Sequence, residues 1–243
     1  MTKFKQSYLI GNLTAGDDMK KIDANLYVYE YTSKIMPGVD FPVRCTAIEL
    51  ENKEVLLISP GPFDQETIRG FMAGYSSVYC AAPNSQHHRH LRRFKELVPE
   101  AGLYGPPALI KKQPRLSGKM LGLEQLEPSL KGQVQMFPIA GNPFLDETVF
   151  YDVKSRSLIV TDLLFNMREP MPLGRKLVLG MVGAKDKIAQ SRLVRKTTGD
   201  REAYDRSIRP IGKLDIQRII VGHGNLIEEA AEVKTALEAI GAL

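Results

Sequence analysis

The sequence predicts an α/β protein built as a four-layer sandwich. Its predicted strands are mostly apolar runs without clean polar alternation, which is typical of sheets covered on both faces. The order of elements is strands, helix, strands, helices, strand and helix, with no clear linker between the halves. This order fits a sandwich of two β-rich halves better than an alternating βα barrel. We therefore expect residues 1–243 to form one domain made of two such halves.

The first half is predicted to contain four strands and two helices. Aromatic and β-branched content indicates the strands, and turns are expected at Met36-Pro37-Gly38 and Asn52-Lys53. A helix is expected to follow Asp64 as its N-cap, and a second has apolar residues at three- and four-residue spacing after His90. The predicted strands are residues 25–31, 43–50, 54–62 and 77–82, and the first helix spans 64–72.

The second half has a weakly patterned start and a clearer end. Residues 103–138 are rich in Gly, Pro and Lys, and we expect short helices there with one strand near 134–137. Two strands then flank a turn at residues 154–156. The remaining predictions are strands at 147–152, 157–162 and 217–221, and helices at 186–195, 201–211 and 226–240.

The net charge of +5 is concentrated in residues 185–218, which hold ten Lys or Arg and five Asp or Glu. Such an excess could hold an anionic substrate or contact nucleic acid. The acidic residues interleave with the basic ones, and no aromatic series is present for base stacking. We therefore favour solvated helices and disfavour a nucleic-acid partner.

Composition also bears on location. Residues 1–6 are polar and lack the apolar stretch of a secretory signal, and no apolar run approaches the roughly 20 residues that span a bilayer. Cys45 and Cys80 each lie among apolar neighbours in a predicted strand, which favours two buried thiols over a disulfide. We expect a soluble cytoplasmic protein without membrane contact. The sequence leaves its oligomeric state open.

Three of the four histidines, His87, His88 and His90, follow one predicted strand, and His223 follows another. Asp162 ends a third. Imidazole nitrogen and carboxylate oxygen are ligands for ions such as zinc, and a bound ion lowers the pKa of water enough to make it a nucleophile. The pattern predicts a site on the rim of a sheet that is suited to a metal ion.

Five segments along residues 25–240 carry a resemblance to a known superfamily. They are residues 56–59 leading into Pro60-Gly61, the histidine segment 76–90, Gly141-Asn142-Pro143, residues 161–165 and Gly222-His223-Gly224. In this order they resemble the Asp-Pro-Gly turn, histidine-rich loop, Gly-His turn, bridging-aspartate strand and last histidine of the metallo-β-lactamase fold. The resemblance implies an αββα sandwich with a metal site where the two sheets meet. The Pro-Asn-x-x-His-His pattern at Pro83 looks most like a divergent branch with a degenerate histidine motif.

The departures from that motif argue against a two-metal site. The usual loop reads His-x-His-x-Asp-His, but alignment of His88 and His90 with its first pair places Arg92 and Arg93 at the last two positions. A register two residues back places Gln86 first and Leu91 last. Ser59 replaces the early acid and Asn142 replaces the Gly-His histidine. The resemblance then leaves Asp162, His223, His88 and His90 as candidate ligands, with His87, Asn84 and Asn142 as additional site residues. This set implies at most one zinc, iron or manganese ion, or none.

Structural roles compete with these assignments. His223 could be a turn residue, and Asp162 could cap a helix starting at Leu163. His87 could pack at a helix start, and Asn84 could serve as a turn or N-cap residue.

Two functions remain open from the sequence. The first is a metal-dependent hydrolase with Asp162 as a catalytic residue, acting on an ester, thioester, lactone or phosphoester of a small molecule. The alternative is a catalytically inactive protein that keeps the fold to bind a ligand or partner, as the lost ligands suggest.

Overall fold

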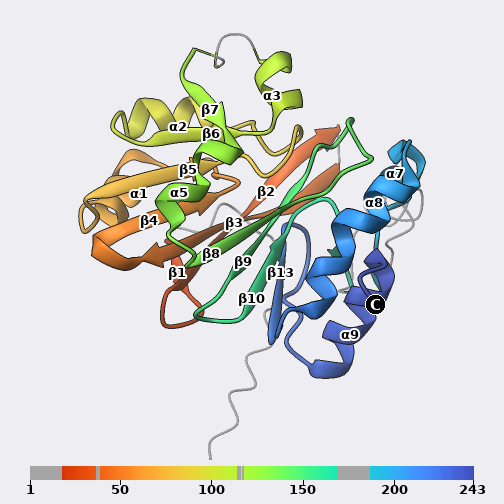
Figure 1. Ribbon diagram of the computed structural model, residues 1–243. Coiled ribbons are helices and arrows are strands. Elements are labelled where there is room, and N and C mark those ends of the chain that lie inside the picture. The colour runs from red at the N-terminus through yellow and green to blue at the C-terminus, as the bar shows by residue number, and fades with distance from the viewer. Residues whose placement is uncertain (1–17, 37–38, 114–115, 117, 169–186) are drawn as a thin grey trace, which may run out of the picture.

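A computed structural model describes residues 18–36, 39–113, 116, 118–168 and 187–243 (Figure 1). The N-terminal residues 1–6, on which the signal-peptide prediction rests, lie outside the described part, as do Pro37, Gly38, Lys185 and Asp186. Among the described helices, none is long and apolar enough to cross a membrane.

The larger sheet has seven strands in sequential order. β1 to β4 are antiparallel neighbours, and β4 to β7 run parallel to one another. The turn between β3 and β4 lies at Asn52 and Lys53, both with positive φ, as the sequence predicted. The strands are β1 (Lys20–Lys21), β2 (Leu26–Met36), β3 (Val39–Leu50), β4 (Glu54–Ile58), β5 (Ser77–Ala81), β6 (Gly102–Gly105) and β7 (Met120–Gly122).

The smaller sheet has four strands in the order β13-β10-β9-β8. β8, β9 and β10 form an antiparallel meander, and β13 joins β10 in parallel. A separate two-stranded pair, β11 with β12, lies between β10 and β13 along the chain. The strands are β8 (Val134–Pro138), β9 (Thr148–Asp152), β10 (Ser157–Val160), β11 (Phe165–Asn166), β12 (Ile188–Ala189) and β13 (Arg218–Val221).

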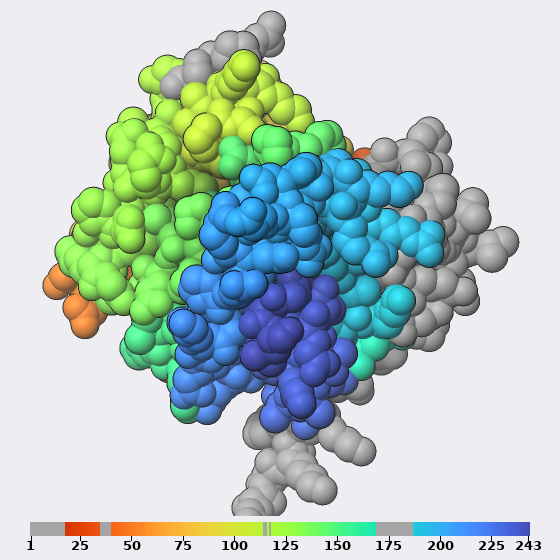
Figure 2. Space-filling view, turned by 45° about the vertical axis from the view of Figure 1, so that its right-hand side comes forward, coloured from red at the N-terminus to blue at the C-terminus, as the bar shows by residue number. Residues whose placement is uncertain are grey.

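Helices cover the outer face of each sheet (Figure 1). α1, α2 and α3 pack on the larger sheet, and α7, α8 and α9 lie on the side of the smaller one. Figure 2 looks onto the latter layer, with α9 in dark blue beside the lighter α7 and α8. The helices are α1 (Gln65–Met72), α2 (Leu91–Leu97), α3 (Pro107–Lys112), α5 (Glu127–Leu130), α7 (Arg192–Thr197), α8 (Arg201–Ile208) and α9 (Ala230–Ile240), with 3-10 turns η1 (Glu51–Lys53), η2 (Leu123–Gln125) and η3 (Arg209–Lys213).

Three apolar clusters hold the layers together. Ile48 and Leu56 of the larger sheet meet Phe150, Ile159 and Ile220 of the smaller sheet in a core between the two. A second cluster lies between the larger sheet and its helices, and a third lies between the smaller sheet and its helices. The layers therefore run αββα, which confirms the four-layer sandwich.

Most element predictions are confirmed, including Asp64 as the N-cap of α1, whose carboxylate accepts from the Thr67 amide. Cys45 and Cys80 are buried free thiols. Residues 102–138 hold two strands, β6 and β7, where none was expected beside β8. Those strands are only four and three residues long, which is too short to show a strand period in the sequence.

Three predicted helices need correction. Residues 186–195 do not form one helix: Ser191 caps α7, and residues 188 and 189 form β12 instead. The closing helix begins at Ala230 rather than 226, because Ile227 pairs with Ile219 of β13. No helix begins at Leu163, so Asp162 is not a helix cap. Leu163 is buried in the helix-facing cluster of the smaller sheet.

Candidate metal centre

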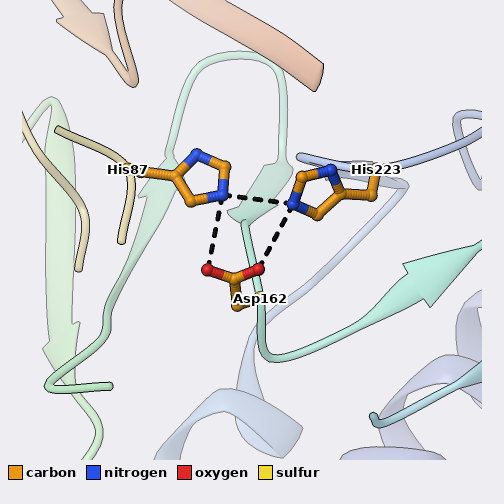
Figure 3. A group of neighbouring side chains, drawn as sticks. All are labelled: His87, Asp162 and His223. Carbon is orange, nitrogen blue, oxygen red and sulfur yellow. Dashed lines mark hydrogen bonds and ion pairs between the residues drawn. The ribbon is translucent and has the colours of Figure 1, made fainter. Parts of the chain in front are cut away.

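Three side chains from distant parts of the chain meet at one edge of the two sheets: His87, Asp162 and His223 (Figure 3). The Nε2 atoms of His87 and His223 lie 3.2 Å apart. Asp162 reaches both rings, with Oδ2 3.4 Å from Nε2 of His87 and Oδ1 3.2 Å from Nε2 of His223. Two imidazole nitrogens and a carboxylate thus converge on one point.

The topology of the smaller sheet explains why Asp162 and His223 meet. β10 and β13 are parallel neighbours with Val160 opposite Val221, and each functional residue stands two positions beyond that pair. Gly222 allows the close approach, since a Cβ there would lie 3.0 Å from Cα of Thr161. The same ends of parallel strands therefore deliver both side chains to one rim.

Asn84 connects the histidine loop to this rim. Its Oδ1 accepts from the backbone amides of Gln86 and His87, as a turn residue does. Its Nδ2 donates to Oδ2 of Asp162 at 2.8 Å, and also lies within hydrogen-bond distance of Thr161 and Glu147. Asn84 is therefore both the predicted turn residue and a direct neighbour of the site.

Hydrogen bonds on the far side of each ring fix how the imidazoles face the site. Nδ1 of His223 donates to the carbonyl oxygen of Pro42 at 2.7 Å, so in the neutral ring Nε2 carries the lone pair. Phe165 stacks on that ring at 5.0 Å between centroids. Nδ1 of His87 lies 2.7 Å from the hydroxyl of Ser59, a buried residue with φ +59°. These contacts are the kind that orient metal-binding histidines.

His87 and Asp162 each shift the pKa of the other. Burial alone would lower the pKa of His87, but the charge and hydrogen bond of Asp162 raise it above its usual value. Burial likewise opposes ionisation of Asp162, yet His87 and His223 hold its pKa well below the usual range. Asp162 is therefore an anion held between two imidazoles.

Glu147 is a buried acid behind the site that the sequence analysis did not identify as functional. Its carboxylate accepts from the backbone amides of Thr161 and Asp162 at 2.8 and 3.0 Å. Burial and the charge of Asp162 raise its pKa to about 7. The available signal was an acid at the start of the predicted strand 147–152, but that position alone does not distinguish Glu147 from a solvent-facing residue.

The structure does not bring His88, His90 or Asn142 into the cluster. Nε2 of His88 lies 3.0 Å from the amide nitrogen of Gln113, and His90 packs edge-on against Tyr31. Asn142 is buried against α7, where its amide donates to Val194 and Thr197. Of the four predicted metal ligands, Asp162 and His223 lie together, and the neighbour that joins them is His87.

The spacing of the three side chains fits a metal ion. Zinc binds imidazole nitrogen at 2.0–2.1 Å in a tetrahedral arrangement, which places two such ligand atoms about 3.3 Å apart. The separation of 3.2 Å between Nε2 of His87 and Nε2 of His223 matches that value. Each ring also lies near a different carboxylate oxygen of Asp162, at 3.2 and 3.4 Å, and one ligand atom from each of the three residues lies within 4.8 Å of the others. Nitrogen and carboxylate donors suit zinc, iron and manganese.

A cavity of about 360 Å³ opens onto the cluster. Its lining includes His87, Asp162 and His223 at the base and Ser59 beside them. Aromatic and aliphatic side chains make up much of the remaining wall, and Arg89 stands among the lining residues. The size is that of a small-molecule site.

Comparison with solved structures shows which fold this is. DIM-1 metallo-β-lactamase exposed to ceftazidime is 13% identical and has a TM-score of 0.62, with 95% of this chain and 98% of that chain covered. The metallo-β-lactamases from Pontibacter korlensis (11% identity, TM-score 0.58, 96% and 100% covered) and Erythrobacter litoralis (11%, 0.59, 93% and 96%) are also similar. No protein-family model matches the sequence, and no curated protein is significantly similar to it. The chain therefore has the metallo-β-lactamase fold, as the resemblance implied.

Proposed function

We propose that this protein is a metal-dependent hydrolase of small molecules, with a single ion held by His87, Asp162 and His223. The observation that carries the proposal is the convergence of one ligand atom from each of the three residues, with the two Nε2 atoms 3.2 Å apart as for two ligands of a tetrahedral zinc ion. The proposed ligand set differs from the sequence-based one, because His87 takes the place of His88 and His90. The bond cleaved is that of an ester, thioester, lactone or phosphoester, and the ion is zinc, iron or manganese.

Each residue of the proposed site would have a distinct role in binding the ion. His223, oriented through Pro42, and His87, oriented through Ser59, each present Nε2 to the ion. Asp162 supplies the anionic oxygen, and Asn84 and the Glu147 network hold it in place. When bound, the ion would polarise the scissile bond and acidify a water molecule. Three protein ligands are typical of catalytic zinc, which keeps one position for water or substrate.

The proposal also covers the cellular location and the domain organisation of the protein. We place the protein in the cytoplasm, which the two buried free thiols support. We also treat the chain as one domain, supported by the apolar core that the two sheets share.

The test is metal stoichiometry on protein purified without a histidine tag and incubated with zinc, iron or manganese. We expect near one ion per chain in the native protein and in His88→Ala and His90→Ala, the matched controls from the same loop. His87→Ala, Asp162→Ala and His223→Ala should each lose the ion while circular dichroism shows an intact fold. Hydrolysis of an ester, thioester, lactone and phosphoester panel should follow the ion content.

Two results would overturn the proposal. One is no stoichiometric ion under any of the three supplements, which would instead support an inactive binding protein. The other is loss of the ion in His88→Ala or His90→Ala with retention in His87→Ala. The intact three-donor cluster favours the enzyme over the inactive alternative.

A further inference from the structure

The cavity that opens onto the metal centre is lined both by apolar side chains and by an arginine. Tyr31, Phe41, Val43, Phe165 and Leu193 contribute apolar surface, and Leu193 is 46% exposed. Apolar side chains of this kind in the wall of a cavity offer surface for the apolar part of a ligand. At about 360 Å³, the cavity suits a small compound with a ring or a branched chain.

Arg89 supplies a positive charge to the same cavity. It follows His87 by two residues, and its Nη1 donates to the hydroxyl of Ser33 at 2.9 Å and to the carbonyl of Lys34 at 3.3 Å. These two bonds hold the guanidinium against β2. They use one of its nitrogens, and both partners are uncharged oxygens.

Neighbouring arginines show that this arrangement is specific to Arg89. Arg92 and Arg93, at the start of α2, both pair with Glu96. Within the described ranges of the chain, no acidic side chain forms an ion pair with Arg89. Among the described lining residues of the cavity, the one acid is Asp162, which is engaged by His87, His223 and Asn84. None of these lining residues is therefore left as an anionic partner for Arg89.

The number of donors favours a carboxylate as the missing anion. A guanidinium matches the two oxygens of a carboxylate in a planar, bidentate arrangement. A phosphate monoester carries close to two negative charges and three acceptor oxygens, which call for more cationic donors. Arg89 is the only Lys or Arg among the described lining residues of the cavity.

We infer that the cavity binds small molecules that combine an apolar, ring-sized body with one carboxylate, and that Arg89 binds the carboxylate and sets this specificity. The identity of these compounds as hydrolysable substrates rests on the proposed function. Their binding does not, because Arg89 and the apolar wall belong to the protein itself. The substrate class is then apolar esters, thioesters or lactones that also bear a free carboxylate.

The experiment measures binding to the metal-free full chain by calorimetry, so that the probe cannot coordinate an ion. The probes are 4-phenylbutanoate, its neutral amide and phenyl phosphate. We expect the carboxylate to bind about tenfold more tightly than the amide, as for a charge-assisted hydrogen bond. Arg89→Gln should remove this preference and leave amide affinity within about twofold. Arg92→Gln, an exposed arginine of the same segment, is the matched control and should keep it.

Several outcomes would refute the inference: equal affinity for carboxylate and amide, an unchanged preference in Arg89→Gln, tighter binding of phenyl phosphate, or no binding of any probe at millimolar concentration. The metal-loaded enzyme provides a separate check, since Arg89→Gln should raise KM about tenfold for carboxylate-bearing esters, with kcat and neutral esters unaffected. Hydrolysis without any such preference would leave the proposed function standing and remove this inference. If the protein never binds metal but calorimetry still shows the preference for the carboxylate over the amide, this inference stands and the proposed function is refuted.

Discussion

The hydroxyl of Ser59 lies 2.7 Å from Nδ1 of His87. In Figure 3, Nδ1 is the ring nitrogen of His87 that joins no dashed line, because Nε2 is the atom that faces Asp162 and His223. A hydroxyl both donates and accepts, so it can pair with either tautomer of the imidazole. When Nε2 faces an ion, Nδ1 carries the proton and donates to Ser59. Ser59 is therefore a positioning residue for His87.

We predict that Ser59→Ala weakens metal binding by about tenfold, because the ring of His87 loses the contact that orients it. Competition with a chromophoric chelator measures the affinity. Ser76→Ala is the control, since its hydroxyl bonds to backbone carbonyls of Asn52 and Lys53 before β5 begins. An affinity unchanged in Ser59→Ala, or equally reduced in the control, would contradict the prediction.

Glu147 should make stability fall as pH rises. Its pKa is about 7 in the folded chain against an ordinary 4.5, so between these values the folded state holds more protons than the unfolded state. The free energy of unfolding of the metal-free chain therefore decreases from pH 5 to 7.5. Glu147→Gln should reduce that decrease by about 2 kcal/mol. Urea unfolding at the two pH values measures it.

The exposed Glu100 provides the comparison for Glu147. Glu100→Gln should leave the pH dependence as it is in the native chain. The same slope in Glu147→Gln and the native protein would show that the buried carboxylate does not hold its proton in this range.

Arg44 ties the two sheets together behind His223. Its buried guanidinium pairs with Glu30 on β2 and donates to the carbonyls of Val221 and Gly224 at 2.5 and 2.7 Å. Arg44→Met should cost about 3 kcal/mol, because it leaves buried carbonyls without a donor and Glu30 without its partner. Arg156→Met, which breaks the exposed pair with Asp215, should cost less than about 1 kcal/mol. If denaturant unfolding shows the same loss of unfolding free energy in both variants, Arg44 does not stabilise the contact between the two sheets.

The sequence was sufficient to predict the fold because the long strands and amphipathic helices have clear local patterns. Continuous apolar runs marked β4, β5 and β10, and the three- and four-residue spacing marked α2. β6 and β7 were not predicted because strands of four and three residues are too short to show a period in the sequence. β12 was assigned to a helix because its pairing with β11 is a tertiary contact.

For the site, sequence order predicted Asp162 and His223, which follow two parallel neighbouring strands. It could not rank His87, His88 and His90, because the loop that holds them is irregular and gives adjacent side chains no fixed direction. The outcome depends on partners far along the chain: Ser59 and Asn84 fix His87, whereas Gln113 and Tyr31 engage its neighbours. Glu147 was missed for the same reason, since its donors lie on the following strand end.

The three donor side chains span 136 residues between His87 and His223 and come from loops of both sheets. An ion held by them would link segments that are far apart in the sequence. The unfolded chain would not bind the ion at this site, so binding would stabilise the folded state. Occupancy would then report directly on folding: at one hundred times the dissociation constant, the ion adds about 2.7 kcal/mol to the unfolding free energy. Chelation should lower the melting temperature of the whole molecule, which turns a thermal scan into an assay for the site.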